Sequence, residues 1–454
     1  MKVVVKLRDY QQRLFDKAHA AMAQGHKRVL VVAPTGAGKS YLFGGMTESA
    51  AVKGPVLVLI HRDELKKQHL KLFEDLGIAT DNIRIESVFT EVNHLGEHPA
   101  PRLIIADEAH LSMAKSWKTV IDFYDTYTVG TTASPLRLDG KPLGDLYSSL
   151  VEDEETTVKA LIKNKRLAPY EYYSIPNDLD FSDLKLQCGD YKIADLEKKM
   201  MSSQLYGDIV QSYEKYAKGK QALCFCVSIK HAKAVAEAFC EAGYKAASID
   251  GKMKPADREA TMNAFRNGEI QVLTNCSIIS EGVSIDGIEA VILARRTASL
   301  ALYIQMVGRA LRYQEGKTAI ILDHAKNYAV HGLPDDDRKW SLTKKHKPRK
   351  EFDDEGNLTV KNCPMCFKCF GGNTRVCPHC GYELPISNRE LQVMQELELK
   401  KIEAEQAAKA EQERKARRRE VGMAKTREEL QRIAELRGYA PAWVWKQCQL
   451  KGIR

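Results

Sequence analysis

Short apolar runs that stop at polar residues dominate the first 110 residues, and they restrict the fold more than any other feature. The first run, Val29 to Val32, leads into Pro34-Thr35-Gly36-Ala37-Gly38-Lys39-Ser40, while Val56 to Ile60 and Leu103 to Ala106 end at His61 and Asp107. Continuous apolar runs of this length, each followed by a helix-like segment, are typical of buried parallel strands with crossover helices. Similar runs recur later, at Ala222–Cys226, Ala246–Ile249, Gln271–Thr274, Ala290–Leu293 and Thr318–Leu322. We therefore expect two α/β sheets in tandem.

The length of 454 residues allows about three domains, and shifts in composition suggest their limits. The expected order is a first sheet domain (1–151), a connecting segment (152–205), a second sheet domain (206–330), a basic linker (331–360), a cysteine-rich ribbon (361–385), a charged helix (386–425) and a C-terminal helical module (426–454). In the last module Thr426 and Glu429 have capping-box spacing, and we expect Gly438 and Pro441 to end that helix.

Composition excludes some classes of protein. Hydrophobic residues make up 44% and charged residues 28%, a balance that excludes disorder of the whole chain. No apolar run approaches the roughly 18 residues of a membrane-spanning helix, and the N-terminus lacks the apolar region of a signal peptide. We therefore expect a cytoplasmic protein with no membrane contact. The net charge, 69 − 60 = +9, favours a polyanionic partner only where it is clustered.

The segment Ala33 to Ser40 has the context of a phosphate-binding loop, because a strand precedes it and a helix follows. Its glycines would let backbone N–H groups wrap nucleotide phosphates, helped by the dipole of the helix. Lys39 would reach the β- and γ-phosphates of ATP, and the Ser40 hydroxyl would ligate Mg²⁺. Thr35, Gly36, Ala37 and Gly38 would complete the cradle. The alternative is a glycine-rich turn without a ligand.

Two acids follow the third apolar run. Asp107 and Glu108 stand where ligands of open α/β sheets bind, at the carboxyl end of a strand. Asp107 suits a Mg²⁺ contact, and Glu108 suits orienting and deprotonating the attacking water. Adjacent acids after a strand are usually a solvated turn, so the phosphate-binding loop upstream supplies the support for this interpretation.

Phosphoryl transfer also needs positive charge in the transition state, often from an arginine of another domain. The second sheet is followed by Gln305 to Arg312, in which Arg309 and Arg312 have the i, i+3 spacing of one helix face and Gln305 lies a turn earlier. A solvated basic face is the alternative.

These residues resemble the motifs of superfamily 2 helicases and translocases in order and spacing, over roughly residues 5 to 330. The motifs are Arg8-Asp9-Tyr10-Gln11 (Q-motif), Ala33–Ser40 (I), His61–Leu65 (Ia), Asp107-Glu108-Ala109-His110 (II, in its DEAH spelling), Gly130–Pro135 (III), Phe225–Ser228 with His231 (IV), Ser280–Ser284 (V) and Gln305–Arg312 (VI). Two positions depart from relatives: Ser284 replaces a common Asp, and Phe89 in Ser87-Val88-Phe89-Thr90 replaces a common Gln.

The resemblance implies two RecA-like domains that close on ATP. It implies that Gln11 reads adenine, that His110 and Gln305 belong to the catalytic set, and that Glu281 and Gly282 of motif V help bind the nucleotide. Arg62, Thr90 and the motif V loop would hold a nucleic-acid backbone.

With the cysteine-rich element and the Gly438-Tyr439…Trp443 tail, the chain is most similar to RadD-type DNA-repair ATPases and their phage-encoded counterparts. This similarity implies a monomeric, ATP-dependent DNA helicase or translocase in repair, recombination or replication, acting on single-stranded or branched DNA in a bacterial cell or, if phage-encoded, in the host. An RNA-directed DEAH helicase and an ATP-switched DNA-binding module without unwinding stay open. A restriction-type motor is also possible, although no nuclease signature is visible.

Four cysteines have the spacing of a zinc ribbon. Cys363, Cys366, Cys377 and Cys380 form a C-x₂-C…C-x₂-C set suited to tetrahedral Zn²⁺. Cys369 and His379 are rival ligands, and a redox or free-thiol cluster is the alternative. So small an element is expected to depend on its metal for folding.

The remaining basic and aromatic residues suggest secondary contacts. Arg338 to Lys350 contains no acid, which favours phosphate binding by Lys344, Lys345 and Lys347, with a solvated linker as the alternative. Trp443 and Trp445 could stack on bases, but sealing the C-terminal module is the more common use of aromatics. A protein partner could bind the ribbon or the tail.

Overall fold

The structure is a computed structural model that describes the chain except for residues 1–4, 138, 176–178, 182, 202, 277–286, 345–351, 354, 356, 373, 387 and 454. It divides into two compact units. The first comprises Met1–Glu351 with Thr359–Leu384, and the second comprises Phe352–Leu358 with Pro385–Arg454. None of the helices in the described part of the chain is long and apolar enough to cross a membrane.

The first sheet has six parallel strands in the order β3-β2-β4-β5-β1-β6. The strands are β1 Arg28–Val32, β2 Val56–Ile60, β3 Ile83–Ser87, β4 Leu103–Ala106, β5 Tyr127–Thr132 and β6 Ser149–Val151. The helical elements are α1 Asp9–Ala23, α2 Lys39–Ala51, α3 Glu64–Asp75, α4 Val88–Glu91, η1 Ala109–Leu111 and α5 Lys115–Tyr124.

Both faces of this sheet are covered, which explains its uninterrupted apolar strands. Along the fully buried β2, Val58 joins the core layer that contains Phe43 of α2. The next residue, Leu59, joins the opposite layer with Trp117 of α5. Successive strand residues thus enter different cores, so an alternating pattern would have left one layer without apolar side chains.

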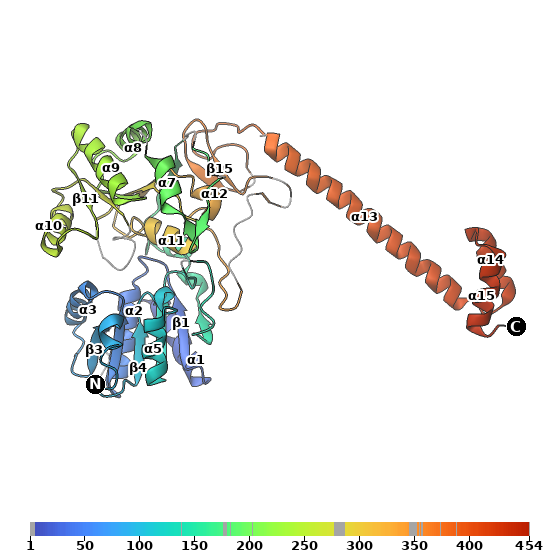
Figure 1. Cartoon of the computed structure of the whole chain (residues 1–454), viewed down its shortest axis with the longest axis horizontal. Coiled ribbons are helices and arrows are strands. Elements are labelled where there is room, and N and C mark those ends of the chain that lie inside the picture. Colours follow the sequence, from blue (N-terminus) through green and yellow to red (C-terminus); the bar gives the residue numbers. More distant parts are fainter. Residues whose placement is uncertain are drawn as a thin grey trace. The chain divides into compact units, whose positions relative to one another are not determined.

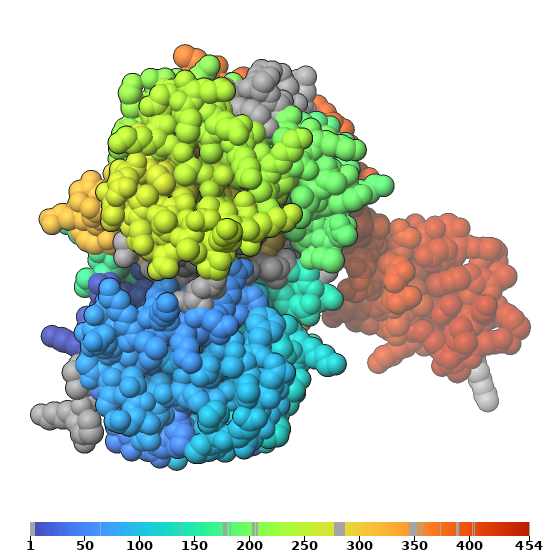
Figure 2. Space-filling view, turned by 60° about the vertical axis from the view of Figure 1, so that its left-hand side comes forward, coloured from blue at the N-terminus to red at the C-terminus, as the bar shows by residue number. Residues whose placement is uncertain are grey.

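The second sheet also has six parallel strands, in the order β11-β12-β10-β13-β14-β7, which confirms the expected tandem architecture. Its strands are β7 Tyr170–Ser174, β10 Ala222–Cys226, β11 Ala246–Ile249, β12 Val272–Asn275, β13 Ala290–Ala294 and β14 Ala319–Asp323. Its helices are α8 Ser203–Tyr216, α9 Ile229–Glu241, α10 Pro255–Arg266, α11 Leu300–Gly308 and α12 Tyr328–His331. Figure 2 shows the two sheet domains as lobes, blue to cyan and green to yellow.

The segment 152–205, expected only to connect the domains, supplies the last strand of the second sheet. Its β7 pairs with β14 from Tyr170 opposite Ala319 to Ser174 opposite Asp323. The segment also forms η2 Glu154–Thr156, α6 Val158–Lys163, a hairpin of β8 Leu186–Gln187 and β9 Asp190–Tyr191, and α7 Ile193–Met200.

The cysteine-rich ribbon packs against β7. It contains the antiparallel strands β15 Val360–Asn362 and β16 Cys369–Gly371. An isolated bridge joins Tyr173 to Lys368, and the backbone N–H of Ser174 donates to the carbonyl of Phe367 at 2.9 Å. The ribbon therefore covers the outer edge of the second sheet and is part of the same unit (Figure 1).

After the second sheet the chain returns to the first domain. The N–H of Gly144 donates to the carbonyl of Leu342 at 2.9 Å, and the Leu342 side chain packs on the first domain's core. A β-carbon at Gly144 would lie only 2.2 Å from that carbonyl oxygen, so the contact requires glycine. The segment between the second sheet and the ribbon thus fastens the two domains together.

The second unit is helical. Its helices are α13 Asn388–Met423, α14 Arg427–Arg437 and α15 Pro441–Lys451. The capping box expected at Thr426 and Glu429 is present, and Gly438 ends α14 with φ +66°, as predicted. Trp443 contacts Tyr439 at a ring distance of 4.7 Å and packs on the small core, whereas Trp445 is exposed.

Candidate active site and metal centre

The loop Ala33–Ser40 joins β1 to α2 and has the backbone expected of a phosphate cradle. Gly36 and Gly38 take positive φ angles of +86° and +75°, which glycine adopts without steric cost. A β-carbon at Gly38 would lie 2.6 Å from Nε2 of Gln11. Lys39 is the first residue of α2, and burial lowers the pKa of its ammonium against the raising effect of Glu108 and Asp107. The loop therefore presents a partly buried cation to its ligand site.

Gln11 supports this loop directly. Its Nε2 donates to the carbonyls of Gly38 at 3.1 Å and Ala37 at 3.3 Å, and its Oε1 accepts from the backbone N–H of Arg8 at 2.9 Å. The Tyr10 hydroxyl donates to the same Ala37 carbonyl at 2.9 Å. These contacts assign Gln11 a structural role, and adenine recognition by it stays a prediction.

Asp107, at the carboxyl end of β4, has three polar neighbours. Its Oδ1 accepts from the backbone N–H of Glu108 at 2.9 Å and lies 3.4 Å from Oγ1 of Thr131. Its Oδ2 lies 3.3 Å from Nε2 of His69, a buried residue of α3. His69 was missed from the sequence because a single histidine on a helix carries no spacing signal.

Glu108 takes a left-handed backbone (φ +50°) and connects the two domains. Its Oε2 lies 3.3 Å from Nδ1 of His110, and Nε2 of His110 lies 3.2 Å from Nε2 of Gln305 in the second domain. Burial alone would raise the pKa of Glu108. The hydrogen bond with His110 and the charges of Lys39, His110 and Arg309 outweigh it and lower the pKa to about 2. Glu108 is therefore an ionised carboxylate at neutral pH.

The arginines of the second domain reach the same place. Burial, followed by the charge of Arg312, lowers the pKa of Arg309 to about 10, while Glu108 opposes that shift. Both arginine charges also act on Lys39. Helix α11 ends at Gly308, so the prediction that Arg309 and Arg312 share a helix face is wrong. They lie in the turn after the helix because the chain must swing toward Leu167, which bridges Arg312.

A close backbone approach explains how the second domain reaches the loop. A β-carbon at Gly308 would lie 2.5 Å from Cβ of Thr35, and one at Gly36 would lie 2.9 Å from Cδ2 of Leu167. The site thus brings together Lys39, Asp107, Glu108, His110, Gln305, Arg309 and Arg312. Ser40 follows Lys39 in α2, and a hydroxyl and a carboxylate such as those of Ser40 and Asp107 are the kind of oxygen ligand that Mg²⁺ prefers.

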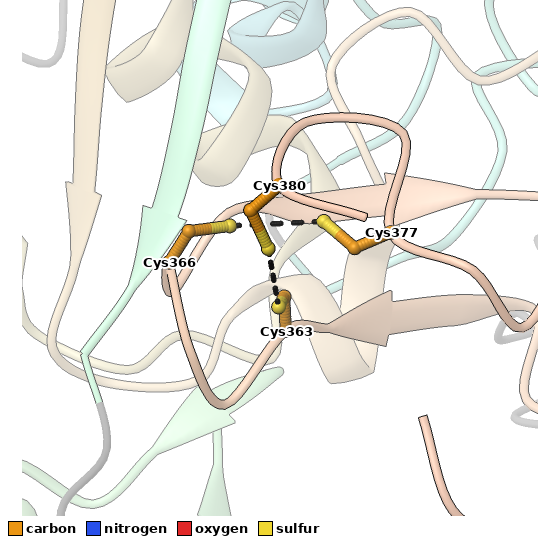
Figure 3. Close-up of side chains that lie close together, drawn as sticks. All are labelled: Cys363, Cys366, Cys377 and Cys380. Carbon is orange, nitrogen blue, oxygen red and sulfur yellow. Dashed lines mark hydrogen bonds between the residues drawn. The ribbon is translucent and has the colours of Figure 1, made fainter. Parts of the chain in front are cut away.

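Among the residues that the structure describes, the four outer cysteines of the ribbon form a cluster that could hold a metal ion. The Sγ atoms of Cys363, Cys366, Cys377 and Cys380 all lie within 4.8 Å of one another, and Figure 3 shows them converging on a common point. The pairs Cys363–Cys380 and Cys366–Cys377 are 3.5 and 3.7 Å apart. Tetrahedral Zn–S bonds of about 2.3 Å place sulfurs about 3.8 Å apart, so these residues fit Zn²⁺.

The rival ligand Cys369 faces elsewhere. Its Sγ accepts from Nδ2 of Asn362 at 3.4 Å, and it is buried in the core of the second sheet domain. Burial, the largest effect, raises the pKa of this thiol, which is typical of an unreactive core cysteine.

The expected nucleic-acid contacts lie partly outside the described residues. Arg62 follows β2, and Thr90 lies in α4, where Ser87 Oγ accepts its backbone N–H at 3.2 Å. Lys344 is exposed. Lys345, Lys347, Glu281 and Gly282 lie outside the part of the chain that the structure describes.

Arg338, the first residue of the basic run, is not available to a partner. It is mostly buried, and its guanidinium donates to the carbonyls of His331, Leu333, Pro334 and Asp336. Burial lowers its pKa. The run therefore begins with a structural residue that shapes the turn before Trp340.

Comparisons with known proteins agree with this geometry. Residues 201–314 match the model of the helicase conserved C-terminal domain, and residues 4–95 match that of the type III restriction enzyme, res subunit. A 51.5 kDa protein of a Lactococcus phage (isolate 7-9) is 36% identical over 378 residues, which cover 83% of this chain and 82% of the phage protein.

Two more distant matches span only part of the other protein. The putative ATP-dependent helicase IRC3 of Saccharomyces cerevisiae is 29% identical over 346 residues, covering 68% of this chain and 50% of the yeast protein. The chain thus spans about half the length of that relative. Among solved structures, the ATP-dependent type ISP restriction-modification enzyme LlaBIII bound to DNA superposes with a TM-score of 0.52 at 18% identity, covering 70% of this chain and 27% of the enzyme. This last likeness shows the fold alone.

Proposed function

Because this chain belongs to the superfamily 2 helicases, we propose that it hydrolyses ATP to move along or remodel DNA. The observation that carries the proposal is the meeting of Lys39 and Glu108 of one domain with Arg309 of the other. A site assembled from two domains changes when its nucleotide changes, so hydrolysis can be converted into domain movement.

In the proposed reaction, the loop Ala33–Ser40 holds the phosphates of ATP and Lys39 contacts the β- and γ-phosphates. Ser40 and Asp107 are the residues that would hold Mg²⁺, which when bound neutralises charge on the phosphate oxygens. Glu108, kept ionised at neutral pH, orients the attacking water and accepts its proton. Arg309 and Arg312 stabilise the charge that develops on the γ-phosphate.

The movement follows from the same contacts. The three cations Lys39, Arg309 and Arg312 repel one another, and a γ-phosphate between them would draw the domains together. Release of phosphate removes that attraction and lets the cleft reopen. Nucleic acid held by Arg62 and Thr90 on the first domain and by motif V on the second would then be moved stepwise.

Three features support DNA rather than RNA as the substrate. One matched family model is named for a restriction enzyme subunit, and one relative is a phage protein that matches 83% of this chain. The restriction-modification enzyme LlaBIII, which shares the fold, was solved bound to DNA. A role in repair, recombination or replication inside a bacterial cell, or in a phage-infected one, follows from the resemblance to RadD-type ATPases. Lys344, Lys345 and Lys347 would add salt-dependent phosphate contacts.

The test is to compare ATP turnover with single-stranded DNA, duplex DNA, forked DNA and RNA of equal length. We expect single-stranded or forked DNA to stimulate turnover most, with strand displacement on the fork. Stimulation by RNA alone would contradict the DNA assignment. Nucleotide-dependent retention on DNA with neither displacement nor movement would indicate an ATP-switched binding module instead.

A further inference from the structure

An aromatic side chain stands exposed beside the proposed nucleic-acid contacts. Phe89 lies in α4 directly after β3, and 55% of it is exposed. Its ring centroid is 5.6 Å from that of His61, which follows the neighbouring strand β2 and precedes Arg62. Two rings that follow adjacent strands therefore meet at the carboxyl edge of the first sheet, and Arg62 and Thr90 are the next residues in the sequence after them.

The short helix under Phe89 is firmly anchored. Ser87 caps it, and its Oγ lies 2.9 Å from Oγ1 of Thr90. At the other end, the buried carboxylate of Glu91 pairs with both terminal nitrogens of Arg84 and accepts from the Tyr124 hydroxyl at 2.7 Å. These contacts fix the backbone on both sides of Phe89, so the fold holds this residue at the carboxyl edge of the sheet.

This arrangement suits a nucleobase. Aromatic rings next to backbone-binding groups stack on successive bases of single strands with little regard to sequence, because every base has a π-face. Bases inside a duplex are already stacked on both sides and offer no free face. A ring at this position would therefore favour single strands without reading their sequence.

We propose that Phe89, backed by His61, is a stacking platform for an unpaired base of a single strand held by Arg62 and Thr90. This proposal rests on the proposed function, and it adds that the nucleic acid must offer an unpaired base at this edge of the sheet. Thr90 and Arg62 would contact phosphates, and Phe89 would contact the base between them. The platform thus binds the strand through a contact that salt does not screen.

The test combines protein variants with a modified strand in the full-length protein. Oligodeoxythymidine and the same strand with abasic sites throughout carry the same phosphates but differ in bases. For the unmodified protein we expect the abasic strand to need about tenfold higher concentration for half-maximal ATP turnover. Phe89→Ala should raise the concentration of the thymidine strand needed for half-maximal turnover by about the same factor. The concentration of the abasic strand needed should not change. Phe89→Trp should retain the preference.

Tyr127 provides the matched control. It is an aromatic residue, 42% exposed, at the first position of β5 and hence at the amino edge of the same sheet. Tyr127→Ala should leave the preference for the base-bearing strand intact. Turnover at saturating DNA should be equal in all variants, because Phe89 lies outside the ATP site.

Two results would overturn the platform. One is an equal preference for the base-bearing strand in Phe89→Ala and the unmodified protein. The other is a fall in turnover at saturating strand with unchanged half-saturation, which would make Phe89 a coupling residue or a contact for a protein. If no nucleic acid stimulates the unmodified protein, the proposed motor itself is wrong, and that outcome is distinct from the other two.

Discussion

Nε2 of His69 lies 3.3 Å from Oδ2 of Asp107, so a buried helix residue holds the carboxylate oxygen that the backbone of Glu108 does not contact. His69 itself is wedged edge-on against the ring of Phe43, with centroids 4.8 Å apart. The acid at the end of β4 is therefore oriented by α3 of the same domain. This contact joins the strand-end motif to the helix that follows Arg62.

Replacing His69 should impair the reaction without unfolding the domain. We expect His69→Leu to lower ATP turnover by about ten- to a hundredfold and to raise the Mg²⁺ concentration needed for half-maximal rate, because Asp107 loses one of its orienting partners. Turnover measured against Mg²⁺ concentration checks this. His19→Ala, in an exposed part of α1, is the control. An unchanged Mg²⁺ requirement with a lower melting temperature would mean that His69 only fills space.

Removing the lysine of the phosphate loop should separate binding from turnover. We expect Lys39→Ala to reduce ATP hydrolysis by at least about a hundredfold, because the cation that interacts with Glu108 and Arg309 is lost. Binding to single-stranded DNA without nucleotide should be unchanged. Lys53→Ala, at an exposed position beyond α2, should keep full activity. DNA-stimulated turnover that persists in Lys39→Ala would contradict the assigned site.

Glu108 should make the free energy of unfolding depend on pH. Its folded pKa of about 2 lies below the ordinary value of 4.5, so its stabilising contribution is complete above pH 4.5 and is lost as pH falls toward 2. The size of the shift corresponds to roughly 3 kcal/mol. The unfolding free energy of wild type should therefore fall more steeply than that of Glu108→Gln as the pH is lowered from about 4.5 to about 2.

Urea unfolding across that range measures the difference, and Glu241→Gln, at an exposed site on α9, reports the general effect of removing a carboxylate. Parallel curves for wild type and Glu108→Gln would rule out the proposed charge interactions. At neutral pH the same variant should bind ATP but hydrolyse it at least about a hundredfold more slowly.

Adding one methyl group at Gly308 should test the contact between the two sheet domains. Gly308→Ala would place a β-carbon 2.5 Å from Cβ of Thr35, which the packed loop cannot accept without moving. We expect about tenfold lower turnover or more, with normal DNA binding, because Arg309 is displaced from the ATP site. Gly422→Ala is the control, since a β-carbon there meets no atom within 4 Å. Full activity in Gly308→Ala would show that the domains meet differently during turnover.

We expect the ribbon to bind zinc and the metal to stabilise the second sheet domain. We expect native mass spectrometry to find one Zn²⁺ per chain, lost in Cys377→Ser and kept in Cys240→Ser, whose thiol lies on α9. Because Phe367 and Lys368 hydrogen-bond or bridge to β7, loss of metal should also lower the melting temperature of the motor. A zinc-free wild type with unchanged stability would contradict the metal site.

The residues that the structure brings together around Lys39 could be predicted from their places at the ends of strands and helices. Lys39, Asp107, Glu108 and Arg309 are each adjacent to a buried strand end or helix end, and topology brings such ends together. His69 could not be predicted, since its role depends on how α3 packs against β4. The end of α11 at Gly308 was also missed, because the chain beyond it turns toward Leu167, a tertiary contact that no local pattern indicates.

Two features at the edges of the second domain also could not be predicted from the sequence. Strand β7 is only five residues long and comes from a segment whose composition suggests a connection, so nothing local marks it as the partner of β14. Arg338 was grouped with the basic run, yet four backbone carbonyls accept its guanidinium. The number of charges along a sequence does not reveal which cationic side chains form hydrogen bonds within the protein.

The contact between the ribbon and β7 has a consequence for the behaviour of the metal-free chain. Only β14 pairs with β7 within its own sheet, and the other side of Tyr173 and Ser174 is covered by Lys368 and Phe367. A strand uncovered on one side is a template for pairing with another molecule. If the four cysteines hold Zn²⁺, chelation should therefore expose this edge of β7 and cause the protein to aggregate.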